Sequence, residues 1–375
     1  MGSIQEQAPV KKLMQLNFFD MACAGSHMPY GQWKEPGDMA QFKDRLEYYQ
    51  WLAQLAEKGK IISIFFADVY GGHDVYGGNM DVMLKGGSNV GVIDPVTIVA
   101  AMAAVTKSVS FGITGSTSYI AAKAMGKDRV PPSHERYEAA EEYLDLTYQP
   151  SLLAHTKAVR EAAARNGRNP ADIKFFAAVT PFIGRTLEEA QEKYHRAKKN
   201  MNGEVSLAKF SAYSGVDMSQ YPLDEPFVFD GNTTSSNIIT GVVNSMKAMF
   251  DKFDGPVTPR MFGEKMSLSG FAPVGTPEMV ADAFEEQFNE TDIDGFNIVY
   301  VSNPGSYEDV VELLVPELQR RGLMWQDYAV PGGTFRENIH SKPGERFLAL
   351  DHPGAKYRKT QNSAANSHEV TASSA

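Results

Sequence analysis

The sequence predicts an α/β protein assembled from strand–helix units, because three features recur along it. Apolar runs of strand length alternate with amphipathic segments of helix length. The run IISIFFADV at 61–69 is apolar almost throughout, which is typical of a parallel strand covered on both faces. Segments rich in glycine and proline separate the units. The alternation is compatible with a (β/α) barrel or with an open doubly wound sheet.

The first unit occupies the N-terminal part of the chain. Residues 13–20 (LMQLNFFD) predict a buried strand. A helix is expected over 45–58, where apolar residues recur at helical spacing and Gly59 ends the pattern. The strand at 61–69 follows at once. Strand, helix and strand in this order form a βαβ unit, which implies parallel strands and a right-handed crossover.

The next connection, residues 70–93, is long and rich in glycine, as loops that carry function often are. Asp94 as N-cap and Pro95 at the first helical position predict a helix that runs to Lys107. A third strand is expected at 108–119. The same patterns predict helices at 133–148, 152–166, 186–200, 237–252, 277–288 and 307–321, and strands at 173–184 and 295–301.

This gives about five strands, whereas a complete barrel needs eight. The expected organisation is a flexible N-terminus at 1–12 and one domain at 13–350 with an insertion near 203–270. A disordered tail is expected at 351–375, which is rich in Ser, Ala, Asn and Thr.

Bulk composition narrows the class of protein. The 375 residues carry a net charge of −10, so no basic field would attract nucleic acid or an anionic membrane. Cys23 is the one cysteine, which excludes an internal disulfide. No apolar run of about 18 residues occurs, and the first residues lack the apolar core of a secretion signal. A cytoplasmic protein is expected.

Polar residues follow the predicted strands, where barrels place their chemistry. His27 comes after the first strand, Asp68 and His73 after the second, and Thr114 at the end of the third. Each has a structural alternative: Asp68 as a turn cap, Thr114 as a β-branched strand residue, and the histidines as exposed loop residues. No phosphate loop, no GxGxxG at a strand–helix junction and no HExxH motif occurs.

Several stretches, in order and in spacing, resemble one family. The chain is similar to the FMN-dependent monooxygenases of the bacterial-luciferase superfamily, of the nitrilotriacetate and dibenzothiophene-sulfone type. The resemblance covers roughly residues 11–350. It rests on LNFFDMACAGSH with GQW (16–33), IFFADVYGGHDVYGG (64–78), DPVTIVAAMAAVT (94–106), FGITGSTSY (111–119), HERYEAAEEYLDL (134–146), PFIGRTLEEAQEKY (181–194) and VELLVPELQRRGL (311–323).

The resemblance implies a luciferase-like (β/α)8 barrel that uses reduced FMN from a separate flavin reductase, together with O₂, to oxygenate a small organic substrate. It also implies that Asp68 and Thr114 contact FMN and that Tyr137 contacts the flavin phosphate, although a tyrosine on a helix can equally be a packing residue. His27 and His73 would lie on the substrate side as candidate catalytic residues. Neither a metal, nor nucleic acid, nor a membrane is implied, and a homo-oligomer is possible.

The chain departs from the family at three places. Ser133, a candidate cofactor-binding residue, stands where the family motif has histidine, and His134 follows one position late. A strand is missing after Ile120, and the strand with the phosphate-binding motif is missing near Gln149, together with the strand after it. Strands four to six are therefore expected to be absent. The alternative function is a catalytically inactive paralogue, splice variant or gene-model fragment that no longer binds FMN. A deazaflavin-dependent oxidoreductase on the related barrel fits the motifs less well.

Overall fold

The computed structural model describes residues 12–24, 30–68, 72–88, 91–115, 151–228, 250–251, 253–268, 270–350 and 352. Five parallel strands form one sheet in the order β3-β2-β1-β7-β4. Two short segments form a second, two-stranded sheet. The strands are β1 (Gln15–Met21), β2 (Ser63–Ala67), β3 (Ser110–Ile113), β4 (Phe176–Val179), β5 (Phe182–Ile183), β6 (Val274–Gly275) and β7 (Gly295–Val299).

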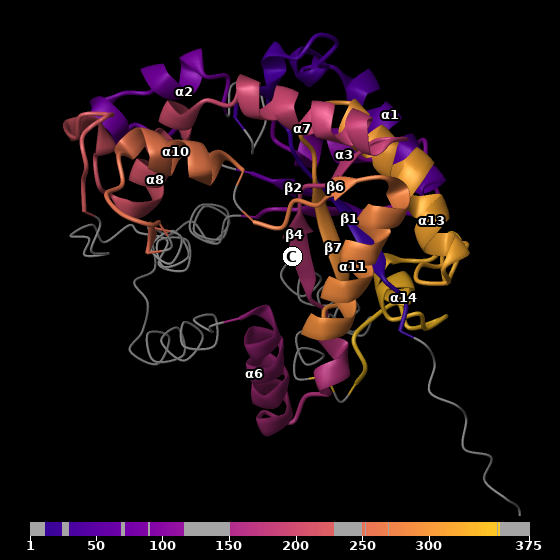
Figure 1. The fold of residues 1–375 in the computed structure, drawn as a ribbon. Coiled ribbons are helices and arrows are strands. Elements are labelled where there is room, and N and C mark those ends of the chain that lie inside the picture. Colours follow the sequence, from indigo (N-terminus) through magenta and orange to yellow (C-terminus); the bar gives the residue numbers. More distant parts are fainter. Residues whose placement is uncertain are drawn as a thin grey trace, which may run out of the picture.

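Helices follow most of the strands, as βα units require. Figure 1 shows α1, α11 and α13 on one side of the sheet, α2, α8 and α10 grouped at another end, and α6 below. The longer helices are α1 (Leu46–Lys58), α6 (Leu152–Arg165), α7 (Leu187–Asn200), α8 (Gly203–Ser214), α10 (Pro259–Ser267) and α11 (Pro277–Thr291). The shorter ones are α2 (Asp81–Lys85), α3 (Val96–Ala103), α12 (Gly305–Asp309), α13 (Val315–Arg320) and α14 (Phe335–Ile339). Single turns are η1 (Gln32–Lys34), η2 (Ala40–Phe42), η3 (Tyr76–Gly78), η4 (Pro170–Asp172), η5 (Met218–Gln220) and η6 (Val310–Leu314).

The sheet is that of an open barrel. β1 lies between β2 and β7, so the first and last strands of the described chain are neighbours, as they are when a barrel closes. β3 and β4 are the outer strands and do not pair with each other. The expected α/β class and the parallel pairing are confirmed, and the described residues contribute five strands to this unclosed sheet. Gly295 fits beside β1 only because it has no side chain, since a Cβ there would lie 1.8 Å from the carbonyl oxygen of Gln15.

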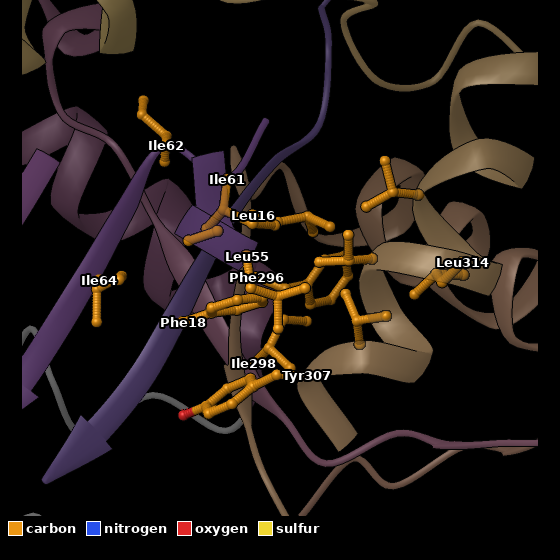
Figure 2. Close-up of a cluster of buried hydrophobic side chains, with 14 of the residues drawn as sticks. Leu16, Phe18, Leu55, Ile61, Ile62, Ile64, Phe296, Ile298, Tyr307 and Leu314 are labelled. Carbon is orange, nitrogen blue, oxygen red and sulfur yellow. The ribbon is translucent and has the colours of Figure 1, made fainter. Parts of the chain in front are cut away.

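The main core lies between the sheet and its helices (Figure 2). Alternate strand residues such as Phe18, Ile64 and Phe296 are fully buried there. On the other face of the sheet, Phe65 and Val299 are only half-buried. The helix layer therefore provides most of the apolar burial, which is the main favourable term in folding.

A second apolar cluster holds the segment that contains α8 and α10. These two helices pack closely, and Phe210 meets Phe262 edge to face with ring centroids 5.2 Å apart. α2 also packs on α8, where Val205 lies against Gly86. The cluster joins the long loop after β2 to the predicted insertion. Within the described parts of the chain, no helix is both long and apolar enough to cross a membrane.

Two helix predictions need correction. The helix expected to reach Lys107 ends at Ala103, because the Glu57 carboxylate accepts the backbone N–H groups of Lys107 and Ser108 at 2.7 and 2.6 Å. The closing helix expected over 307–321 runs from 305 to 320 and contains the π-helical turn η6. Pro316 follows this turn, and a proline within a helix lacks the N–H needed for the regular pattern.

The strand expected over 173–184 is also shorter and divided. β4 pairs with β7, whereas β5 pairs with β6. Pro181 lies at the break, where it can donate no ladder hydrogen bond. The predicted helices at 133–148 and most of 237–252 lie outside the described residues.

Candidate active site

The polar residues that follow β2 and β3 meet at the carboxyl-terminal end of the sheet. Asp68 directly follows β2, and Thr114 directly follows β3. Phe66 of β2 and Ile113 of β3 are partners in register. Asp68 and Thr114 therefore lie at the ends of adjacent strands. The backbone N–H and the hydroxyl of Thr114 both donate to the carbonyl oxygen of Phe66, each at 3.1 Å. The structure thus brings two of the predicted site residues to one edge of the sheet.

The other predicted site residues are placed less completely. His73 lies in the loop between β2 and η3, and its Nε2 is 3.0 Å from Nζ of Lys209 on α8. Burial, followed by the nearby Lys209 ammonium, lowers the pKa of His73 to about 4, so the ring is neutral at pH 7. His27, Ser133 and Tyr137 lie outside the described residues.

A buried ion pair joins Asp20 of β1 to Lys43, and sequence reasoning did not find it. Both side chains are 0% exposed. The carboxylate also accepts the Tyr48 hydroxyl at 2.9 Å and the backbone N–H of Met21 at 2.7 Å. The ammonium donates to the Tyr300 hydroxyl at 2.8 Å. The network therefore links the end of β1 to Tyr300, which follows β7. It holds the carboxyl-terminal ends of these two strands in place.

The same network extends to Asn303. Its side-chain amide donates to the Tyr48 hydroxyl at 2.8 Å, and its backbone N–H donates to Asp38 Oδ2 at 3.2 Å. Burial raises the pKa of Asp38 above its usual range, although the backbone N–H groups of Ala40 and Asn303 oppose the shift. The network thus continues from the core to the wall of an open cleft, which Asp38 lines.

This cleft has a volume of about 630 Å³, within the usual size range for sites that bind small molecules. Ala24, next to Cys23, forms part of one wall, and Leu84 and Gly87 at the end of α2 form another. Trp33 is 46% exposed in the cleft, and its indole N–H donates to the carbonyl oxygen of Gly86 at 2.9 Å. The cleft therefore offers a largely apolar surface beside the end of β1.

Cys23 is the residue of this region whose chemistry is easiest to test. Its side chain is fully buried beside the Asp20–Lys43 pair. Burial is the largest cause that raises the pKa of the thiol to about 11, although Lys43 opposes it. A thiol reacts as the thiolate, so Cys23 is unreactive at neutral pH.

We expect native protein at pH 8 to resist alkylation by iodoacetamide, because the thiol is both buried and protonated. In urea the thiol regains an ordinary pKa of about 8.5 and should be labelled rapidly. Intact-mass spectrometry counts the adducts, and the single cysteine makes the count unambiguous. Rapid labelling of the native chain would contradict this placement of Cys23.

Comparison with known proteins places the chain among monooxygenases. The long-chain alkane monooxygenase of Geobacillus thermodenitrificans (strain NG80-2) is 28% identical over 92% of this chain and 98% of the relative. The dimethyl-sulfide monooxygenase of Hyphomicrobium sulfonivorans is 27% identical over 93% of this chain and 94% of the relative. Nitrilotriacetate monooxygenase component A of Aminobacter aminovorans is 22% identical over 88% of this chain and 96% of the relative. No family model matches the chain.

The solved structure of the long-chain alkane monooxygenase LadA has the same fold. It matches with a TM-score of 0.73 and 26% identity, over 93% of this chain and 100% of that one. The alignment with the alkane monooxygenase of Geobacillus is 460 positions long, which is longer than this whole chain of 375 residues, of which 92% is aligned. The relative therefore contains internal segments that this chain lacks, in agreement with the open sheet.

Proposed function

This chain is a monooxygenase homologous to the luciferase-like flavin-dependent enzymes, and on that premise we propose that it uses reduced FMN from a separate reductase. With O₂ as the second substrate, it oxygenates a small organic molecule in the cytosol. The observation that carries the proposal is sequence similarity to several monooxygenases over about nine-tenths of the chain. The name of the nitrilotriacetate enzyme, component A, supports a partner that supplies the flavin.

The donor set at the strand ends fits the ring system of a flavin. In its oxidised form this ring is planar and uncharged, with N–H and carbonyl groups along one edge. Asp68 offers a carboxylate, and Thr114 offers an oxygen whose proton is already donated to Phe66. Both are acceptors suited to a ring N–H. Tyr137, which we assign to the flavin phosphate by resemblance, and Ser133, which we assign to the cofactor site, lie outside the described residues.

In this arrangement the protein binds, orients and shields. We assign Asp68 and Thr114 to holding the ring, while the bound flavin supplies the activation of O₂. We assign the cleft beside Trp33 and Ala24 to the entry of the substrate. Relatives named for an alkane, a sulfide and nitrilotriacetate leave the substrate class open.

A titration with FMN, followed by flavin fluorescence under oxidised and dithionite-reduced conditions, tests this assignment. We expect saturable binding, and Asp68→Ala should weaken it about tenfold or more, because hydrogen bonds to charged groups contribute roughly 1.5–3 kcal/mol. Thr114→Val should weaken it by a smaller factor. Asp74→Ala, an exposed carboxylate of the same loop, and Thr106→Val, a threonine at a helix end, serve as matched controls.

The open sheet favours one alternative, in which the chain is an inactive paralogue, splice variant or gene-model fragment. A folded wild-type protein that binds no FMN in either redox state would support this alternative and overturn the proposed function. Binding that both site variants leave unchanged would overturn the roles of Asp68 and Thr114. Sequencing the transcript across Ile120 and Gln149 shows whether longer messages exist.

A further inference from the structure

Three side chains form a compact group between helix α8 and the long loop after β2. Nζ of Lys209 lies 3.0 Å from Nε2 of His73 and 5.2 Å from the ring centroid of Tyr213. The rings of His73 and Tyr213 meet edge to face, with their centroids 5.9 Å apart. Lys209 is 2% exposed, and no carboxylate among the described residues forms an ion pair with it. Within the described part of the chain, the partners of this ammonium are therefore two rings.

The loop that carries His73 is attached to the region of α8 at further points. The Tyr76 hydroxyl donates to Glu204 Oε1 at 3.2 Å. The backbone N–H of Gly77 donates to Asp217 Oδ1 at 3.0 Å. Both contacts lie close to His73 in the sequence, so the region around α8 determines where the imidazole lies.

The contact between Lys209 and His73 determines which ring nitrogen carries the proton. An ammonium has three N–H donors and no acceptor. Burial lowers the pKa of Lys209 to about 8, so at pH 7 most of it is still charged. The ammonium therefore donates to Nε2, which leaves the single proton of the neutral ring on Nδ1. Nδ1 forms no hydrogen bond with the described residues, and the ring is only half-buried, so this N–H is available to a ligand.

The pair of Lys209 and His73 lies near the strand ends that carry the proposed flavin site. His73 follows Asp68 in the loop after β2. Lys209 and Asp68 are both close enough to Cys23, which follows β1, to affect the pKa of its thiol. The pair and the ends of β1 and β2 therefore belong to one region of the molecule.

We propose that Lys209 is a positioning residue that holds His73 as a neutral ring with its proton on Nδ1. His73 then offers the site a hydrogen-bond donor and no base, because Nε2 is occupied by the ammonium and Nδ1 already carries a proton. A substrate group that meets this ring is therefore a hydrogen-bond acceptor. The inference rests on the proposed function, because it assigns a role at the same site.

NMR spectroscopy of the full chain with ¹⁵N-labelled histidine tests the proposal, because long-range proton–nitrogen spectra distinguish protonated from unprotonated ring nitrogens. The spectrum of His73→Gln identifies the signals of His73. Wild type without flavin at pH 7 should show a proton on Nδ1 and none on Nε2. Lowering the pH to 5.5 should leave this pattern unchanged. Burial, followed by the Lys209 ammonium, lowers the pKa of His73 to about 4, although the Asp74 carboxylate opposes the shift.

Substitution of the lysine separates its role from that of burial. In Lys209→Met the proton should be shared between the two ring nitrogens, because neither has a fixed partner. The proton affinity of His73 should rise about tenfold, because a like charge no longer opposes the second proton. Lys209→Arg keeps a cationic donor and should restore the Nδ1 form. Lys265→Met, which changes an exposed lysine of α10, should give the wild-type spectrum.

Raising the pH of wild type from 7 to 9.5 provides the same test without a substitution. Lys209 loses its proton in this interval, so Nε2 of His73 should become partly protonated. Burial raises the pKa of Cys23 to about 11 and that of Tyr213 to about 12, so neither neighbour changes its charge there. This titration decides the matter if Lys209→Met does not fold.

Three results would overturn the proposal. The first is wild-type His73 with its proton on Nε2, or with two protons, at pH 7. The second is an unchanged spectrum in Lys209→Met that circular dichroism shows to be folded. The third is a wild-type spectrum that stays constant up to pH 9.5. Because these spectra are recorded without flavin, failure to bind FMN in the separate titration would overturn the proposed function and leave the assignment of the ring proton intact.

Discussion

Replacing Lys43 by methionine is expected to lower the free energy of unfolding by about 3–5 kcal/mol. The substitution removes the cation that neutralises Asp20, and both side chains are fully buried. The carboxylate would keep the hydrogen bonds from Tyr48 and Met21 but would remain a buried charge without a counterion. Urea unfolding followed by circular dichroism measures the change.

The control for this prediction is a second lysine in an ion pair at the surface. Lys58 pairs with Glu312, and both side chains are largely exposed. Lys58→Met should therefore cost less than about 1 kcal/mol. The double variant Asp20→Asn with Lys43→Met should recover most of the lost stability, because neither buried charge remains. Equal losses of stability in Lys43→Met and Lys58→Met would contradict the role assigned to burial.

Truncation of Phe296 is expected to be comparably damaging, with Phe296→Ala costing about 3–5 kcal/mol. The side chain is fully buried near the start of β7. Its ring centroid lies 4.4 Å from that of Phe284 on α11 and 6.2 Å from that of Phe271. Truncation leaves a cavity where the sheet meets its helix layer, and the pairing of β7 with both β1 and β4 holds its backbone in the sheet.

Thermal unfolding by calorimetry measures this effect, with Phe335→Ala as the matched control. Phe335 is 42% exposed at the start of α14, and surface substitutions usually change stability by less than about 0.5 kcal/mol. A similar loss of stability in both variants would contradict the assignment of Phe296 to the core between β7 and α11.

The sequence predicts the sheet well because its strands are short segments rich in apolar residues between helical patterns. The predicted strand at 61–69 contains β2, and this prediction alone places Asp68 at the end of a strand. The errors have local causes. Glu57, far back in the sequence, captures the amides that would have extended α3, and no pattern within 94–107 reports this contact. Pro181 does carry the signal that divides β4 from β5.

The buried lysines were missed for different reasons. Lys43 lies in the polar segment QFKDR, where nothing distinguishes it from an exposed residue. Its burial depends on Asp20, which is 23 positions away. For Lys209 a signal was present, because Val205, Lys209 and Tyr213 recur at helical spacing in an otherwise apolar or small-residue helix. A lysine on such a face indicates burial.

The difference between the two faces of the sheet has a consequence for how this chain can change over generations. A closed barrel constrains every strand position, since the side chains on one face fill the interior while those on the other meet the helices. Here Ile64 and Phe296 are under that constraint, whereas Phe65 and Val299 on the opposite face are half-buried. Selection for folding acts weakly on the second set. Those positions can accumulate variation while the helix-covered layer keeps the chain folded.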